Sequence, residues 1–113
     1  MDEEADELTQ IAFEVILSAG DARNCLNEAI AHVAELDFEA AAKSMDKADA
    51  LITKAHNAQT GIIQRQAAGE KFEYSILFVH AQDTLMTIDA QVHLFTKLIP
   101  VFKTLAANGS SEK

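Results

Sequence analysis

The residues of this sequence best suited to chemistry near neutral pH are four histidines, His32, His56, His80 and His93. Imidazole titrates in that range and can act as a base, a nucleophile or a metal ligand. His80 differs from the others because it opens a polar patch within the most hydrophobic segment of the chain. On a helix, Asp83 shares a face with His80 and Thr87 continues that face. Spacing alone leaves open whether the patch has a structural or a chemical role.

Asp83 is the carboxylate of this patch. A carboxylate buried among apolar residues must be paired, protonated or bound to a cation, and no Lys or Arg lies within one helical turn of it. If copies of the segment met around a symmetry axis, their Asp83 side chains would converge and a divalent cation would relieve the repulsion. We therefore expect Asp83 to lie inside an assembly.

The other three histidines favour structural roles. His32 falls near the end of the first expected helix, where a positive charge complements the helix dipole. His93 lies among apolar neighbours and is expected to be partly buried or interfacial. His56 is followed one turn later by Gln59 and Thr60, so a polar site there is the alternative to a structural role.

Several other chemistries are excluded by the sequence. It has no Gly-rich phosphate loop, no nucleophile elbow, no second Cys beside Cys25 for a zinc site and no paired Glu-x-x-His motifs for a di-iron site. The formal net charge of −9 argues against a nucleic-acid binder. The lone cysteine, the acidic N-terminal residues and the lack of a long apolar run predict a cytoplasmic protein.

The elements that would position these residues are three long helices, which predict an all-α fold, an antiparallel three-helix bundle. Apolar residues at steps of three and four mark a first helix from about Leu8 to Val33. Asp37 is the expected N-cap of a second helix, from Phe38 to about Ala68, and Gly69 the left-handed residue that ends it. Ser75 would cap a third helix, from Ile76 to about Ala107, with a bend near Pro100. We expect one domain, 1–107, and a disordered tail, 108–113.

The third helix is apolar on more than one face. A helix that is apolar nearly all round must be buried nearly all round, yet each helix of a three-helix bundle keeps a side in solvent. The surplus apolar surface predicts self-association through the third helix.

Three blocks of the sequence carry a resemblance to a known family. They are Ala12-Phe13-Glu14-Val15-Ile16-Leu17-Ser18-Ala19-Gly20-Asp21-Ala22-Arg23, then Ala55-His56-Asn57-Ala58-Gln59-Thr60 leading to Ala68-Gly69-Glu70, and Val79-His80-Ala81-Gln82-Asp83 with Leu85-Met86-Thr87. The chain resembles the lactose/cellobiose-specific enzyme IIA family. Members are phosphocarriers of the bacterial phosphoenolpyruvate-dependent sugar phosphotransferase system (PTS).

The resemblance implies a phosphotransferase component that forms a homotrimer of nine helices. His80 would accept a phosphoryl group from the histidine-containing carrier HPr and pass it to a cysteine of enzyme IIB, which serves the membrane enzyme IIC. Asp83 would match the axial aspartate, three copies of which share one divalent cation, commonly Mg. Gln82 would support the site.

Two positions refine this expectation. Many relatives carry a second His directly after the aspartate, where this chain has Thr84, so the phosphohistidine must find other donors. Ala81 is more typical of cellobiose or chitobiose members than of lactose members, which tend to have Gly there.

Two other functions are weighed against this one. A histidine-phosphotransfer domain of two-component signalling is also a helical bundle, but it usually carries Lys and Gly soon after its histidine, and Ala81 to Thr84 do not match. A helical adaptor without chemistry is the second alternative, which differs from a carrier in forming no phosphohistidine.

Overall fold

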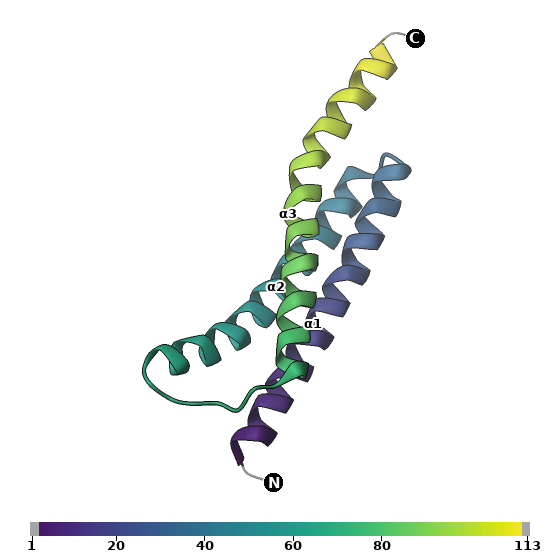
Figure 1. The fold of residues 1–113 in the computed structure, drawn as a ribbon. Coiled ribbons are helices and arrows are strands. Elements are labelled where there is room, and N and C mark those ends of the chain that lie inside the picture. The colour runs from purple at the N-terminus through teal and green to yellow at the C-terminus, as the bar shows by residue number, and fades with distance from the viewer. Residues whose placement is uncertain (1–2, 112–113) are drawn as a thin grey trace.

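The computed structural model describes residues 3–111, with side chains from 7 to 109, and this part of the chain contains three helices and no strands. They are α1 (Glu3–Ala34), α2 (Phe38–Ala67) and α3 (Ile76–Ser111). Figure 1 shows α1 and α2 as an antiparallel hairpin with α3 lying along it. The molecule measures 67 × 22 × 18 Å. The predicted all-α three-helix bundle is confirmed.

The core is a narrow seam of mostly small residues, because alanine dominates the inward faces of α1 and α2. The buried apolar residues of the seam on the first two helices are Leu8, Ala12, Val15, Ala19, Ala22, Leu26, Ala29 and Val33 on α1, and Ala41, Met45, Ala48, Ile52, Ala55 and Ile62 on α2. Side chains without bulk let the two helices approach closely near the turn that joins them (Figure 1). Ile11 and Phe38, which the periodicity places on these faces, are half-buried and pack against the core.

The turn between α1 and α2 confirms one prediction and adds one feature. Asp37 caps α2, since its Oδ1 accepts a hydrogen bond from the Ala40 N–H at 3.1 Å. Leu36 has φ 60, and the N–H groups of Leu36 and Asp37 donate to the Val33 and His32 carbonyls. These bonds form a Schellman ending with Leu36 at the position usually held by Gly. A side chain there costs about 1 kcal/mol, so no sequence rule predicts it.

The loop between α2 and α3 begins with the predicted glycine. Gly69 has φ 105, and Gly69 N and Glu70 N donate at 3.0 Å to the Gln66 and Arg65 carbonyls. This second Schellman ending uses the residue that adopts the left-handed region freely. At the other end of the loop, Ser75 Oγ accepts from Phe78 N at 3.1 Å, which confirms Ser75 as the cap of α3.

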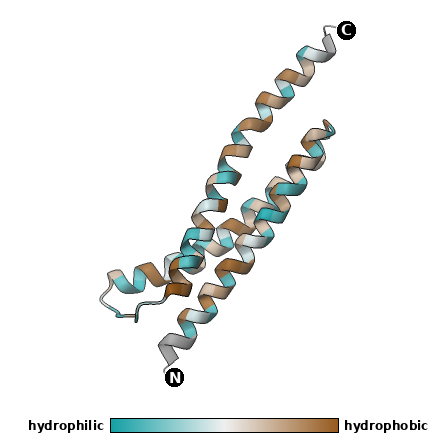
Figure 2. Ribbon diagram, turned by 45° about the vertical axis from the view of Figure 1, so that its right-hand side comes forward, coloured by the Kyte–Doolittle hydropathy of each residue, from teal (hydrophilic) through white to brown (hydrophobic). Residues whose placement is uncertain are grey.

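The end of α3 differs from the prediction. The sequence predicts a helix end near Ala107 and a tail over 108–113, whereas the helix continues through Ser111; residues 112–113 lie outside the described part. Gly109 costs only about 1 kcal/mol in a helix, which does not stop an established hydrogen-bond ladder. Pro100 also lies within the helix without ending it. As a result α3 projects beyond the α1–α2 turn (Figures 1 and 2).

Within residues 3–111, no helix is long and apolar enough to cross a membrane.

Candidate functional site

The two faces of α3 differ in what covers them. The inward face packs into the core through Phe78, Ala81, Leu85, Ile88 and Val92. The outward face carries exposed apolar side chains, namely Ile76, Val79, Met86, Leu94, Val101 and Leu105. In Figure 2 hydrophobic residues recur along the whole length of α3. The surplus of apolar residues predicted from the sequence is therefore an uncovered surface in the single chain.

His80 lies on the outward side of α3, in its second turn, and is exposed. Its backbone carbonyl accepts a hydrogen bond from Thr84 Oγ1 at 2.9 Å. No hydrogen bond to its imidazole ring is found among the described side chains. A nucleophilic nitrogen of His80 is thus open to an incoming group from solvent.

Asp83 is exposed in the single chain, and its burial inside an assembly stays a prediction. It lies on the outward face, between the exposed apolar side chains of Val79 and Met86. Thr87 is exposed on the same side, as the spacing predicts. Only a second chain packed on this face could remove Asp83 from water.

Gln82 does not lie beside His80 within one chain. Residues two apart on a helix point about 200° away from each other at 100° per residue. Gln82 is half-buried and lines a cleft of about 350 Å³ with Ser75, Phe78 and Val79, at the start of α3. Its amide therefore belongs to the opposite flank of the outward face from His80.

Thr84 takes the position where many relatives carry a second histidine. It is half-buried, and its hydroxyl donates to the backbone of His80 rather than to the imidazole ring. Within one chain this position supplies no donor toward a group on the His80 ring, unless the hydroxyl leaves its helical partner.

The structure brings His56 and His93 together, which the sequence analysis does not predict. They line a cleft of about 260 Å³ between α2 and α3, with Asp49, Thr53, Asn57 and Asp89. His56 Nδ1 lies 3.2 Å from Thr60 Oγ1. His93 Nδ1 lies 2.9 Å from both the carbonyl oxygen and Oδ1 of Asp89, and because both are acceptors this nitrogen carries the proton.

The structure also shows the surroundings of the three histidines for which structural roles were expected. Of the two residues one turn after His56, Thr60 contacts its ring, whereas Gln59 faces the core and is buried. His93, expected to be partly buried or interfacial, has a side chain 68% exposed in the single chain, which leaves the interfacial position as the prediction. His32 is half-buried at the end of α1.

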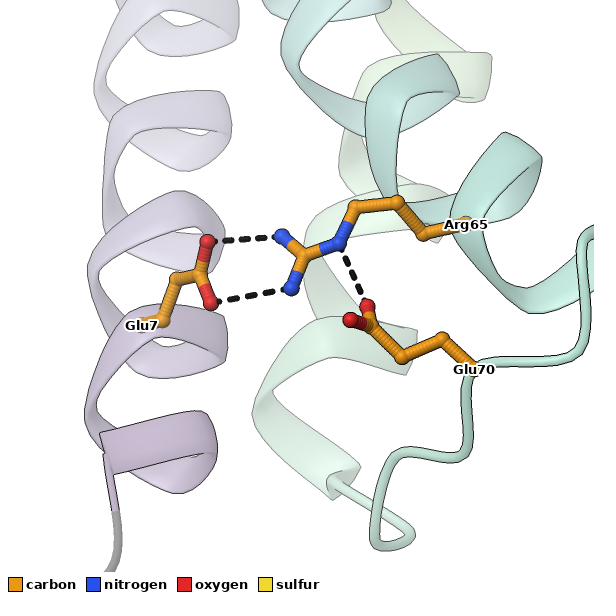
Figure 3. Close-up of polar contacts among 3 residues, drawn as sticks. All are labelled: Glu7, Arg65 and Glu70. Carbon is orange, nitrogen blue, oxygen red and sulfur yellow. Dashed lines mark hydrogen bonds and ion pairs between the residues drawn. The ribbon is translucent and has the colours of Figure 1, made fainter.

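Arg65 holds three segments together at the end of the molecule where α3 begins. Its guanidinium binds both carboxylate oxygens of Glu7 on α1, at 2.6 and 3.1 Å, and its Nε lies 2.5 Å from Glu70 Oε2 in the loop (Figure 3). It also lies 4.9 Å from the centre of the Phe72 ring. The hydrogen bond from Arg65 lowers the pKa of Glu7. No local spacing rule could have found this cluster, because Glu7 is distant in sequence.

A metal site is not formed by one chain alone. Among the described residues, no group of three or more His, Cys, Asp or Glu side chains is placed to hold an ion. The one cysteine, Cys25, is half-buried in the C-terminal half of α1, and burial raises the pKa of its thiol.

Comparison with known proteins decides the family. Residues 10–103 match the family described as "PTS system, Lactose/Cellobiose specific IIA subunit". The chain belongs to this family. The resemblance found in the sequence is therefore confirmed, and the chain is a sugar-specific IIA component of the PTS.

Relatives named for different sugars are about equally similar to this IIA chain. The lactose-specific EIIA component of Staphylococcus epidermidis is 38% identical over 98 residues, covering 87% of this chain and 94% of the relative. The crystal structure of the PTS cellobiose-specific enzyme IIA from Bacillus anthracis superimposes with a TM-score of 0.83 and 37% identity, over 95% of this chain and 94% of that one.

A third similar structure is described as a complex. It is the solution structure of IIA(Chitobiose) with HPr from Escherichia coli, with a TM-score of 0.73 and 29% identity over 94% of this chain and 99% of that chain. This IIA chain therefore shares its fold with a protein whose structure was determined with a phosphoryl carrier.

Proposed function

We propose that this IIA chain carries a phosphoryl group on His80 between HPr and enzyme IIB. The observation that carries the proposal is the exposed imidazole of His80 on the outward face of α3. A neutral ring nitrogen attacks the phosphorus of phosphohistidine on HPr, the donor's P–N bond breaks, and the donor imidazole leaves. A cysteine thiolate of enzyme IIB then takes the group by the same kind of displacement, and His80 is restored.

HPr as the donor is supported by the Escherichia coli chitobiose relative, whose structure is described as a complex with HPr. Enzyme IIB and the membrane enzyme IIC follow from the organisation of the PTS. The net charge of −9 favours partners that bring basic residues to the exposed apolar surface around His80. Among disaccharides, Ala81 favours cellobiose or chitobiose over lactose.

The active form that we infer is a homotrimer joined through the outward faces of three α3 helices. The exposed members of this face recur at steps of three and four and run almost straight along α3: Val79, Asp83, Met86, Ala90, Leu94, Lys97 and Val101. Apolar residues dominate this stripe, and so large an exposed apolar surface is unusual in a monomer. A closed threefold arrangement covers the stripe of each chain with those of the other two.

Such an assembly gives Gln82 a role that one chain cannot provide. His80 and Gln82 flank the stripe on opposite sides, because they are two residues apart on the helix. Around a threefold axis, the His80 side of one subunit faces the Gln82 side of its neighbour. We therefore assign Gln82 a supporting role across the interface, where its amide N–H can donate to the phosphoryl oxygens.

Asp83 fits a divalent cation on the same axis. Its carboxylate is exposed and lies in the stripe between Val79 and Met86, so three copies would converge when the faces meet. Carboxylate oxygens are the ligands that Mg²⁺ prefers, and the ion would neutralise charges that otherwise repel. One ion per trimer, held by three Asp83 side chains, is the arrangement that we propose.

The test is phosphoryl labelling with a matched histidine control. The chain is incubated with phosphoenolpyruvate, enzyme I and HPr, and its intact mass is measured. Wild type and His93→Gln, which alters another exposed histidine of α3, are expected to gain one acid-labile phosphoryl group per chain. His80→Gln is expected to fold and gain none. Labelling of His80→Gln would overturn the assignment, and absence of labelling in wild type would favour the adaptor.

A further inference from the structure

The cleft at the start of α3 opens beside the stripe that we assign to the trimer interface. It lies where the loop of residues 68–75 meets the helix (Figure 1) and has a volume of about 350 Å³. Its α3 side is formed by Phe78, Val79 and Gln82. Val79 is 46% exposed and is also a member of the stripe. The mouth of the cleft therefore borders the surface that another chain would cover.

A threefold axis along α3 would bring His80 of one chain to the cleft of the next. Rotation about such an axis leaves the height of a residue along it unchanged. His80 is one residue from Val79 and two from Gln82, so it lies within about 3 Å of their height at the usual rise per residue. Because His80 and Gln82 flank the stripe on opposite sides, the His80 side of each chain faces the Gln82 side of its neighbour. The imidazole of the neighbouring chain would thus reach the mouth of the cleft.

Tyr74 is the lining residue best suited to meet a phosphoryl group on that imidazole. Its side chain is 82% exposed, and its hydroxyl has no hydrogen-bond partner among the described residues. A phenol keeps its proton near neutral pH and donates a hydrogen bond to an oxygen. Ser75 also lines the cleft, but its Oγ caps α3. Glu73, a third lining residue, carries a negative charge that repels a phosphoryl group.

We propose that this cleft completes the phosphoryl site of the neighbouring chain, with Tyr74 as a catalytic residue that acts across the interface. When the phosphoryl group is on His80, the Tyr74 phenol of the adjoining chain donates a hydrogen bond to one of its oxygens. The phenol keeps its proton, so only the P–N bonds of the proposed transfer break and form. A donor fixed in the site stabilises the transferring group without having to reorganise. The inference rests on the proposed function and on its trimer.

The first experiment removes the hydroxyl and keeps the ring. Transfer from phospho-HPr to Tyr74→Phe is measured over a range of donor concentrations. We expect kcat to fall roughly tenfold, the scale of one hydrogen bond to a charged group, and KM to stay within about twofold of wild type. Lys71→Gln, which removes a charge from the same loop outside the cleft, is the control and should keep both values. An unchanged kcat in Tyr74→Phe would overturn the proposal.

Mixed trimers test whether Tyr74 acts on the neighbouring chain. Tyr74→Phe chains are co-expressed with an excess of His80→Gln chains, which cannot be labelled but bring an intact Tyr74 to their neighbours. We expect the rate of labelling per His80 to return to within about twofold of the wild-type rate. An excess of chains that carry both substitutions is the matched control and should give no recovery. A defect that persists beside His80→Gln chains would overturn the proposal, because Tyr74 would then act within its own chain.

The wild-type chain separates a failure of this inference from a failure of the proposed function. Absence of labelling in wild type would refute phosphoryl transfer on His80, and labelling of a wild-type chain that stays single would refute the trimer. Either result would also end the proposed role of Tyr74. Labelled wild-type trimers together with a Tyr74→Phe chain of unchanged kcat would refute the role of Tyr74 alone.

Discussion

The inward and outward faces of α3 are built from the same kinds of residues and have opposite surroundings. Leu85 and Met86 are neighbours in sequence, yet Leu85 is 0% exposed and Met86 is 52% exposed. The inward face is filled by α1 and α2, whereas the outward face has apolar side chains and a carboxylate that nothing in the single chain covers. The difference teaches that one side of α3 is explained by the fold and the other only by other chains.

The largest expected effect comes from placing charge on the outward face. Met86→Lys brings three ammonium groups together in the proposed trimer, so we expect it to dissociate into single chains that keep their helical circular dichroism. Light scattering after size exclusion measures the mass. Ala50→Lys, an exposed change on α2, is the control and should keep the wild-type mass. If Met86→Lys still forms trimers, the outward face of α3 is not the trimer interface.

A substitution on the inward face is expected to change the stability of the single chain rather than its assembly. Leu85→Ala leaves a cavity in the core, and we expect the free energy of unfolding to fall by about 2–5 kcal/mol. The matched change Met86→Ala removes an exposed side chain and should leave thermal unfolding of the dissociated chain almost unchanged, while weakening association. Urea denaturation is carried out at protein concentrations below and above those at which the trimer forms. This separates the effect on folding of the single chain from the effect on association. If Leu85→Ala and Met86→Ala lowered the free energy of unfolding of the dissociated chain equally, the two faces of α3 would not differ in burial as described.

Asp83→Leu changes the one acidic residue of the outward stripe into an apolar one. We expect loss of divalent-cation binding with the trimer retained, because convergent charges are replaced by apolar contact. Bound metal is measured by elemental analysis after dialysis, and mass by light scattering with and without a chelator. If chelation dissociated wild type and the leucine failed to restore assembly, the axial position of Asp83 would be contradicted.

The smallest effect concerns an unsatisfied polar atom on the inward side. Gln59 is buried on α2, and its Oε1 has no hydrogen-bond partner among the described residues. Replacing a side chain whose buried carbonyl oxygen lacks a partner by an apolar one of similar size is expected to stabilise the chain, so Gln59→Met should raise the free energy of unfolding by roughly 1 kcal/mol. Denaturation curves measure the change. A destabilised Gln59→Met would mean that the amide has a partner outside the single chain.

The fold could be predicted from the sequence to the extent that local rules decide it. Apolar spacing predicts the inward faces, and Asp37, Gly69 and Ser75 are predicted as helix ends because each has a side-chain or backbone property that favours that position. Leu36 could not be predicted, since its left-handed backbone is imposed by the hairpin against its own preference. The extension of α3 through Ser111 was missed because Gly109 weakens a helix without ending it.

The candidate site was predictable in its residue types and less so in its geometry. His80 and Asp83 were predicted from their place in an apolar segment, and both lie on the outward face. Asp83 is exposed in the single chain, and its burial in an assembly stays a prediction, because a sequence does not say which chain covers a face. Gln82 was expected to support the site, although helical spacing separates it from His80 within one chain. The Arg65 cluster needed tertiary structure, since it joins α1, α2 and the loop.

The central claim is that the outward face of α3 assembles the chain and carries the phosphoryl group. Native mass spectrometry of the wild-type chain, after incubation with phosphoenolpyruvate, enzyme I and HPr, tests both parts at once. We expect a species of three chains that gains up to three phosphoryl groups, and the same trimer without them when His80→Gln is used. A phosphorylated single chain as the main species, or a trimer that stays unmodified, would contradict it.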